Sequence, residues 1–468
     1  MILSSDKREG ETMIQVAESY MGELVHRSMV QVRFNNVKSS PTKFEDYSRN
    51  TTRLVINLDE EYSRKKVNYY FSKKRDKKCY RSILLLGQFG ARSLPRSLGS
   101  HVANFRFLKV FSVEKYTNFS GAFSHINFGR ALGALVYLRY LSVRGTNLLV
   151  FPSIQKLVLL QTLRLHTCDD MYALPWLSRD VLVKLDCLRH LYLPKFKVDV
   201  LVRKSKLRFN GLSKLETLEN FDTTWCEVKD LRELINLRKL MVTVRGSCDI
   251  LEEMMKNLDD IASSPSSCLS YLGVAISNCH LELNNGLTIL KQLVYAENLN
   301  LRDLKIYGRI PEVGLIFPLQ YVSTIGITSL TLASSCLEED PMPILEMLPM
   351  LGVLCLFKDT YVGKEMVCSA TCFPKLTSLY LQEFPNLEKW RVEKGSMPML
   401  SYLRIERCNK LEELPEGLVF LKSLQVLDIF HMLQDFNDRL KRHDGEEGPD
   451  FHKISHVDRL IIDDQELN

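Results

Sequence analysis

The sequence predicts an α/β solenoid, in which short repeats stack into a curved array with a parallel sheet inside and an irregular or helical outer face. Three observations lead to this prediction. One apolar phrase recurs along most of the 468 residues. Each copy ends in an alternating apolar pair that suits a short strand. The copies follow one another at steps of 22 to 32 residues, a spacing typical of repeat proteins.

The recurring phrase is L-x-x-L-x-x-L-x-L, with conservative replacements. A clean copy consists of Leu348, Leu351, Leu354 and Leu356. Its third apolar position marks each copy, and these markers are residues 111, 141, 163, 191, 218, 240, 272, 304, 330, 354, 379, 403 and 427. Two earlier segments, 53–56 and 82–85, are expected to begin the array. Such a phrase defines a leucine-rich repeat.

The physical basis of the phrase is the alternation of side chains along a strand. In the closing L-x-L, the leucines point inward and the residue between them points outward. One unit cannot bury its apolar face alone, so neighbouring units stack and share a continuous core. Amphipathic helices also produce L-x-x-L. However, the L-x-L ending is followed by Pro, Asn, Cys or Gly, which does not continue a helix.

Composition and charge exclude several classes of protein. Hydrophobic residues make up 45% of the chain, which is typical of folded proteins, and the net charge of +6 is too small to indicate a nucleic-acid partner. No apolar run is long enough for an integral membrane segment, and the first residues carry no secretory signal. We therefore expect a cytoplasmic protein, with a nuclear or membrane-peripheral fraction left open.

The twelve cysteines show no C-x-x-C motif and no paired framework. The closest pair, Cys368 and Cys372, has no histidine pair nearby that would complete a zinc site. Free thiols in a reducing compartment are therefore expected, without a metal or other cofactor. No Ser-His-Asp or paired-acid arrangement is supported by the spacing, so we expect no enzymatic activity.

Two segments resemble a known family. Residues 16–32, VAESYMGELVHRSMVQV, resemble the end of the winged-helix part of plant intracellular nucleotide-binding leucine-rich-repeat receptors with a coiled-coil N-terminus. Residues 384–400 and 408–418 resemble the closing repeats of the same disease-resistance receptors. The resemblance covers about residues 11–460. It implies a leucine-rich-repeat solenoid preceded by a short winged-helix remnant.

The chain departs from this family at the nucleotide switch. No G-x-x-x-x-G-K-[ST] loop occurs, since Gly363-Lys364 is followed by Glu365. The Met-His-Asp triplet that the family carries after its RSMVQV strand is also missing from residues 33–41. We therefore expect the C-terminal part of a receptor without its nucleotide-binding domain. The expected domains are a winged-helix remnant (1–40), a basic linker with the first repeat (41–80), the leucine-rich-repeat domain (81–430) and an acidic tail (431–468).

Outward residues of the inner strands are the candidate partner-binding positions, because many adjacent strands form a wide contact surface. These are Arg164, His166, His190, Tyr192, Tyr380, Gln382, Tyr402, Arg404, Asp428 and Phe430. A basic cluster could dock within a receptor, and it consists of Lys73, Lys74, Arg75, Lys77 and Lys78. Simple cross-strand packing and a solvated linker are the alternative interpretations of these two sets.

The resemblance implies a non-enzymatic protein of plant innate immunity. Its partners would be a pathogen effector or a guarded host protein, together with the nucleotide-binding domain of a related receptor. The alternative is a leucine-rich-repeat substrate adaptor of a ubiquitin ligase, although residues 11–32 fit the winged-helix phrase better than an F-box. A decoy acting with an intact receptor and a non-functional remnant also remain open.

Overall fold

The computed structural model describes fifteen stretches of the chain. They are residues 31–32, 53–57, 80–86, 102–114, 131–144, 152–166, 179–194, 206–245, 248–263, 268–277, 301–310, 312–317, 325–443, 446–463 and 465–467. The chain divides into two compact units. Unit 1 contains residues 1–202 and 207–214, and unit 2 contains residues 203–206 and 215–468.

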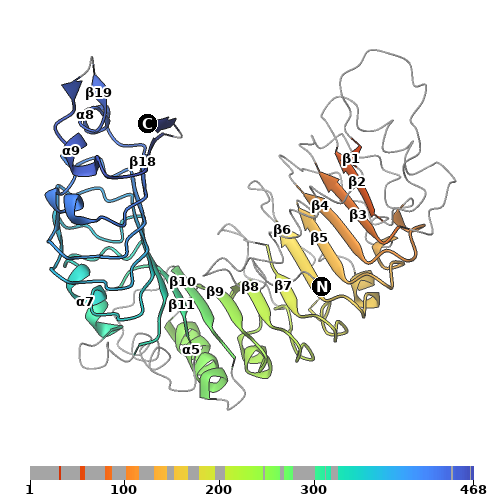
Figure 1. The fold of residues 1–468 in the computed structure, drawn as a ribbon. Helices are drawn as coiled ribbons and strands as arrows, with labels where there is room; N and C mark the ends of the chain where they lie inside the picture. The colour runs from red at the N-terminus through yellow and green to blue at the C-terminus, as the bar shows by residue number, and fades with distance from the viewer. Residues whose placement is uncertain are drawn as a thin grey trace, which may run out of the picture. The chain divides into compact units, whose positions relative to one another are not determined.

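Unit 1 contains a parallel sheet in which each strand pairs with the next along the chain (Figure 1). Its strands are β1 (Gln31–Val32), β2 (Arg53–Asn57), β3 (Ser82–Leu86), β4 (Val110–Glu114), β5 (Tyr140–Arg144), β6 (Thr162–His166) and β7 (His190–Tyr192). One short 3-10 helix, η2 (Pro152–Lys156), precedes β6. The predicted start of the array at residues 53–56 and 82–85 is confirmed by the pairing of β2 with β3.

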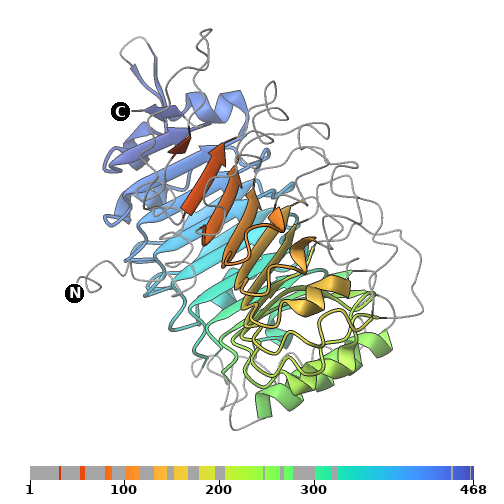
Figure 2. The ribbon, with the colours of Figure 1, turned by 90° about the vertical axis from the view of Figure 1, so that its right-hand side faces the viewer.

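Unit 2 continues the same pattern, and its parallel strands lie side by side in Figure 2. They are β8 (Thr217–Asp222), β9 (Lys239–Arg245), β10 (Tyr271–Ser277), β11 (Asp303–Tyr307), β12 (Ser329–Ala333), β13 (Val353–Phe357), β15 (Ser378–Gln382), β17 (Tyr402–Glu406), β18 (Val426–Phe430) and β21 (Arg459–Ile462). The final strand, β22 (Gln465–Leu467), pairs antiparallel with β21.

The marker residues of the repeat lie opposite one another in these ladders. Leu330 pairs with Leu354, which pairs with Leu379, and the same holds along both units. All thirteen markers are completely buried. The predicted alternation is therefore confirmed, because the residues on either side of each marker form the opposite face.

Several elements lie outside the main sheets. They are α5 (Cys248–Ser263), α7 (Met342–Leu345), α8 (Gln434–Asp438), α9 (Phe451–Ile454), η3 (Val228–Glu233), η4 (Val313–Leu315), η6 (Glu416–Phe420), and the small two-stranded sheets of β14 (Glu365–Cys368) with β16 (Lys389–Val392) and β19 (Arg442–His443) with β20 (Glu446–Glu447). Helix α5 buries Met254, Leu258 and Ile261, which its helical period places on one face. This helix accounts for the long 32-residue step between markers 240 and 272.

At the N-terminal end of the array the first strand was predicted from the sequence, whereas at the C-terminal end the last parallel strand was not. The predicted strand before residue 33 is present as β1, which pairs with β2 in the repeat sheet. The helix predicted for the winged-helix remnant lies outside the described residues. At the other end, the parallel sheet continues through β21 into the segment that was predicted as an acidic tail. The signal was present in the sequence, since Ile454, Val457, Leu460 and Ile462 repeat the phrase.

The C-terminal segment is held by a buried lysine. Lys453 in α9 is only 1% exposed. Its ammonium donates to the Leu414 carbonyl at 2.8 Å and lies 2.8 Å from Glu416 and 3.1 Å from Asp450. Asp450 also accepts two bonds from Arg439, at 2.9 and 3.0 Å. Buried lysines are rare unless they are paired in this way, so this network joins the last repeats to α9.

Replacing Lys453 with Met should therefore destabilise the chain by about 2–3 kcal/mol, because the Leu414 carbonyl and Asp450 lose a charged partner. Burial raises the pKa of Asp450, but hydrogen bonds from Arg439, Leu414 and Lys453 outweigh it, and the net pKa is lowered. A lowered carboxyl pKa stabilises the fold above its unfolded value of about 4. The difference between the two proteins should thus shrink as the pH falls below about 4.

Urea unfolding at neutral and acidic pH measures this effect. Lys422→Met is the matched control, because Lys422 is exposed and should change stability by no more than about 0.5 kcal/mol. Equal effects of the two substitutions at neutral pH would contradict the assigned role of Lys453.

Candidate functional site

Three neighbouring strands of unit 2 bring most of the predicted binding residues together. The register aligns Tyr380 on β15 with Arg404 on β17 and Asp428 on β18. One row further along, it aligns Gln382 with Glu406 and Phe430. Tyr402 precedes Arg404 on β17. We call Phe357, Tyr380, Tyr402, Arg404, Glu406, Asp428 and Phe430 the inner-face cluster.

Aromatic rings form a continuous part of this cluster. The ring centroids of Phe357 and Tyr380 are 6.4 Å apart in an edge-on arrangement, and those of Tyr380 and Tyr402 are 5.2 Å apart. The guanidinium carbon of Arg404 lies 4.7 Å from the centre of the Phe430 ring. These contacts link four successive strands, β13, β15, β17 and β18. Each of these rings therefore packs against a ring or a guanidinium of a neighbouring strand.

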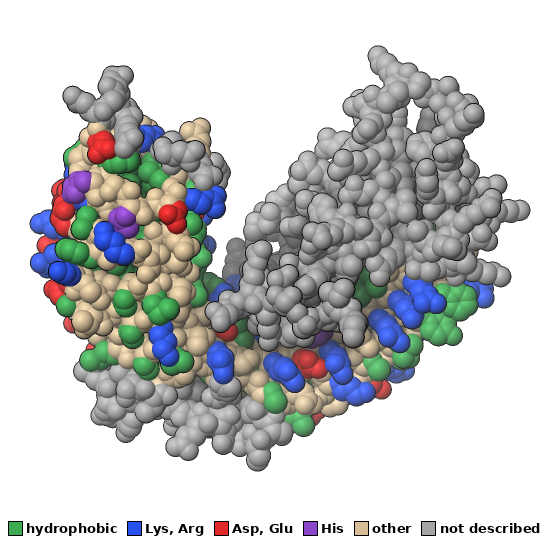
Figure 3. All heavy atoms as spheres, in the orientation of Figure 1, with side chains coloured by type: hydrophobic (Ala, Val, Ile, Leu, Met, Phe, Trp, Pro, Cys, Tyr) green, Lys and Arg blue, Asp and Glu red, His purple; other side chains and the backbone are tan. Residues whose placement is uncertain are grey.

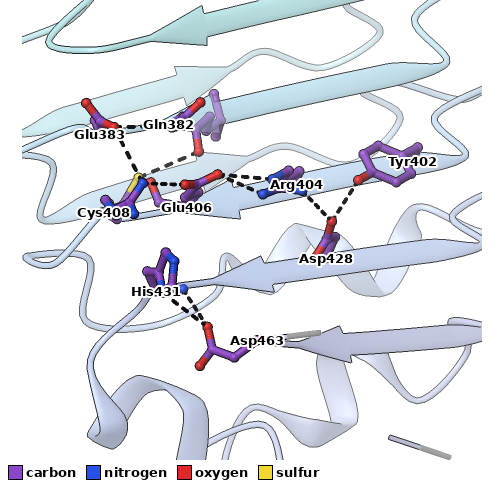
Figure 4. A network of polar contacts seen from close by, with 11 residues as sticks. Gln382, Glu383, Tyr402, Arg404, Glu406, Cys408, Asp428, His431 and Asp463 are labelled. Carbon is purple, nitrogen blue, oxygen red and sulfur yellow. Dashed lines mark hydrogen bonds and ion pairs between the residues drawn. The ribbon is translucent and has the colours of Figure 1, made fainter. Parts of the chain in front are cut away.

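Ion pairs fix the polar half of the cluster (Figure 4). Arg404 donates to Glu406 at 2.9 Å and to Asp428 at 3.0 Å. The hydroxyl of Tyr402 donates to the same oxygen of Asp428 at 2.8 Å. Arg407 lies outside the strand and pairs with the other oxygen of Glu406 at 2.6 Å. Both carboxylates are buried, so the guanidinium of Arg404 compensates charge that water cannot reach.

This arrangement also changes the titration of Tyr402. Burial, and the hydrogen bond and negative charge of Asp428, raise the pKa of Tyr402 to about 12. The phenol therefore remains a neutral donor across the physiological range. Burial likewise raises the pKa of Tyr380. The cluster thus presents neutral phenols beside a guanidinium that bonds Glu406 and Asp428, while Oδ1 of Asp428 is buried without a hydrogen-bond partner.

A small pocket opens among these side chains. Its volume is about 230 Å³, and it is lined by Phe357, Tyr380, Leu381, Gln382, Arg404 and Glu406. Small-molecule sites usually occupy about 300–1,000 Å³, so this pocket suits a single side chain of a partner. The outward residues of β12, β13 and β15 beside it are all uncharged, namely Ser329, Thr331, Ala333, Val353, Cys355, Phe357, Ser378, Tyr380 and Gln382.

The predicted residues of unit 1 form a second, smaller group. Arg164 on β6 pairs in register with Tyr192 on β7, and its guanidinium carbon lies 4.2 Å from the centre of that ring. His190 aligns with Thr162 one row earlier. Tyr192 is only 6% exposed, so cross-strand packing accounts for its position. His166 is the last residue of β6, and its side chain is not among those that the structure describes.

Four residues at the site were not among the predicted binding positions, namely Phe357, Glu383, Glu406 and Arg407. Glu406 follows from the strand alternation, since it occupies the outward position after Arg404 on β17. Phe357 occupies the third outward position of β13, one row beyond the pairing of Cys355 with Tyr380. Counting strand positions would have identified it. Glu383 and Arg407 directly follow β15 and β17, and both have positive φ angles, of 60° and 50°. No sequence signal marks them, because such backbone usually belongs to glycine or asparagine.

The described residues give no chemical centre of another kind. Burial raises the pKa of Cys355 to about 11 and that of Cys408 to about 12, so these thiols stay protonated. Within the described ranges, no three potential metal-ligating side chains gather. No helix among the described residues has the length and apolarity to span a bilayer. The basic cluster of Lys73, Lys74, Arg75, Lys77 and Lys78 lies outside the described residues.

Comparison with known proteins identifies the repeat class. A family model described as leucine-rich repeat region matches residues 91–410, and this chain belongs to that family. It is 29% identical to "Probable disease resistance RPP8-like protein 2" of Arabidopsis thaliana, over 96% of this chain and 49% of that protein. It is 31% identical to "Disease resistance protein RPP8" of the same plant, over 70% and 33% of the two chains.

A third relative, "Probable disease resistance protein RF9" of Arabidopsis thaliana, is 30% identical over 78% of this chain and 35% of its own length. The chain thus spans half or less of these relatives. It is homologous to the C-terminal leucine-rich-repeat half of coiled-coil nucleotide-binding disease-resistance proteins, which confirms the sequence resemblance. A solved internalin from Listeria monocytogenes is 12% identical, with a TM-score of 0.40 over 77% of this chain and 93% of that one.

The ion pairs of the cluster lead to a stability prediction. Replacing Arg404 with Gln should destabilise the chain by about 3 kcal/mol, because Glu406 and Asp428 would remain buried without their shared cation. Replacing Arg407 with Gln is the matched control. Arg407 pairs with the same Glu406, but its side chain is 45% exposed, so about 1 kcal/mol or less should be lost. Urea unfolding of both variants measures the difference, and a larger loss for Arg407→Gln would contradict the assignment.

Proposed function

We propose that this chain is a non-enzymatic recognition module of plant immunity, with the inner-face cluster as its contact surface for a pathogen effector or a host protein that an effector has altered. The supporting observation is the preorganised group of Tyr380, Tyr402 and Arg404. Tyrosine and arginine are the residue types most often found at binding hot spots. Here ion pairs and rigid strands hold them in place, so little side-chain freedom is lost on binding.

The charge pattern supports a protein partner. The outward residues of β12, β13 and β15 form an uncharged strip, in which Thr331 and Ala333 are buried and the residues of β13 and β15 are partly exposed. Charged residues flank this strip on both sides, for example Lys305 on β11 and Arg404 on β17. Protein interfaces commonly have such an apolar centre with a polar rim. The pocket beside Phe357 and Tyr380 would accept one uncharged anchor side chain from the partner.

A second part of the proposal concerns regulation. The relatives are disease-resistance proteins, and this chain covers half or less of their length. We infer that it restrains the nucleotide-binding domain of a related receptor and that the basic cluster at residues 73–78 provides the electrostatic contact. Both activities place the protein in the cytoplasm. The relatives named above carry the name disease resistance protein, which favours this function over that of a ubiquitin-ligase adaptor.

The recognition surface can be tested by recovering bound proteins from infected leaves. The wild-type chain and a Phe357→Ser/Tyr380→Ser variant would be purified in parallel, and their bound proteins compared by mass spectrometry. At least one protein should bind the wild type and be reduced about tenfold or more with the variant, since two anchor positions are lost. A Met350→Ser variant is the control, because Met350 is an exposed residue outside the strands. Identical sets of bound proteins for all three forms would exclude the inner-face cluster as the recognition surface.

Regulation requires a separate measurement. The chain would be co-expressed with the coiled-coil and nucleotide-binding domains of RPP8, and co-immunoprecipitated. We expect binding that is lost when Lys73, Lys74, Arg75, Lys77 and Lys78 are changed to Glu, because opposite charges would become like charges. The Phe357→Ser/Tyr380→Ser variant should still bind. Absence of binding by a folded wild-type chain would refute this part of the proposal alone.

A further inference from the structure

A series of turns in unit 1 presents side chains away from the core. In the repeats that lead into β4, β5, β6 and β7, the phrase L-x-x-L closes a turn, in which the amide of the fourth residue donates to the carbonyl of the first. Such bonds join Leu108 to Phe105 at 3.0 Å, Leu138 to Leu135 at 2.9 Å, Leu160 to Leu157 at 2.9 Å and Leu188 to Leu185 at 2.9 Å. The first and fourth residues of each turn are buried. The two middle residues therefore face outward.

Three successive turns carry large apolar side chains at their middle positions, one in the first turn and two in each of the next two. Phe107 is 51% exposed, Tyr137 48% and Val158 48%. Val136 and Leu159 are also exposed, and the rings of Phe107 and Tyr137 stack with centroids 5.9 Å apart. We call these five residues the turn ridge. A contiguous apolar group on a surface usually marks a contact site.

Basic residues form a row beside the turn ridge. The residues directly before β3, β4, β5, β6 and β7 are, in this order, Arg81, Lys109, Arg139, Gln161 and Arg189. The backbone amide at each of these positions donates to the carbonyl at the preceding one, at 2.7–2.8 Å. The series begins with the Lys109 amide bonding the Arg81 carbonyl and ends with the Arg189 amide. Adjacent positions are therefore about 4.8 Å apart. Arg106 and Lys156 add two exposed cations from the neighbouring turns.

The charge of this surface has one sign. Among the described side chains of unit 1, the carboxylates are those of Asp180 and Asp186. Both lie in the repeat that leads into β7, one repeat beyond the turn ridge. In Figure 3, basic and hydrophobic side chains are interspersed along the edge of the molecule that Figure 1 labels β4 to β7, with acidic ones near β7. Around the three turns of the ridge, the charged side chains that the structure describes are Arg81, Arg106, Lys109, Arg139 and Lys156, and all of them are basic.

This alternation distinguishes between classes of partner. The centre of a protein interface is usually depleted of charge, whereas here Arg106 adjoins Phe107 and Lys109 and Arg139 closely follow the ring-bearing turns. Nucleic acid would use the cations and the two rings, but it would leave Val136, Val158 and Leu159 exposed to water. Apolar and aromatic residues interleaved with arginine and lysine suit the boundary between lipid headgroups and acyl chains.

We propose that the turn ridge and its basic row form a docking surface for an anionic phospholipid membrane. Basic side chains would contact the headgroups, and Phe107, Tyr137 and the aliphatic residues would enter the interface. The turn ridge belongs to unit 1, whereas the inner-face cluster belongs to unit 2. Each cation near an anionic bilayer strengthens binding about fivefold, so the row supports reversible attachment.

Vesicle co-sedimentation of the full chain tests the proposal. The probes are vesicles of phosphatidylcholine with about 30% phosphatidylserine and vesicles of phosphatidylcholine alone. We expect binding to the anionic vesicles that weakens with added salt. Lys109→Glu/Arg139→Glu should weaken it by at least about 25-fold, from about fivefold for each lost cation. Phe107→Ser/Tyr137→Ser should weaken it by about tenfold or more.

The equivalent turns of unit 2 provide a matched control. Lys375 and Met399 are exposed middle residues of turns at 373–376 and 397–400. Lys375→Glu/Met399→Ser should bind the vesicles like the wild type, within about twofold. Circular dichroism of each variant is the control for folding. Failure of the wild type to bind anionic vesicles would overturn the proposal. Equal losses for the unit 2 control, or tighter binding of single-stranded RNA through the same residues, would overturn it as well.

Discussion

The structure depends on one constraint, the register of the parallel ladder between successive repeats. Leu330, Leu354 and Leu379 lie opposite one another because β12, β13 and β15 pair without a shift. The one described irregularity in register lies between β8 and β9, after the marker pair Leu218 and Leu240. A shift of one residue would turn every leucine toward water and every outward residue toward the core. Each full leucine side chain transferred to water costs about 2 kcal/mol. The stacked leucines therefore enforce the register across all rungs of each unit.

The same constraint creates both proposed contact surfaces. Because outward positions align from strand to strand, Tyr380, Arg404 and Asp428 meet on neighbouring rungs although 24 residues separate each from the next. The turn ridge arises in the same way, since the turns before β4, β5 and β6 stack with their strands. The leucines of the repeat hold the position of the surfaces, and the residues between the leucines determine what each surface binds. Function can thus vary without change to the core.

The sequence alone predicted the repeats and their inward residues, because the apolar period directly reports burial. It also selected most of the inner-face cluster, since outward positions follow from the alternation. It could not reveal that Glu406 and Asp428 share Arg404, because this pairing depends on register between repeats. Nor could it reveal the positive φ angles of Glu383 and Arg407. The last strand was missed because β21 follows a 33-residue step that contains two short helices.

The most direct test of this account is a disulfide across two outward positions. Thr331 and Cys355 are register partners on β12 and β13, so their Cα atoms should be about 4.8 Å apart, within the range that a disulfide spans. In a Thr331→Cys variant, mild oxidation should join the new cysteine to Cys355. Ser329→Cys should not react with Cys355, because a diagonal separation of about 8 Å is too long. Cross-linking in the second variant, or none in the first, would contradict the register on which the inner-face cluster depends.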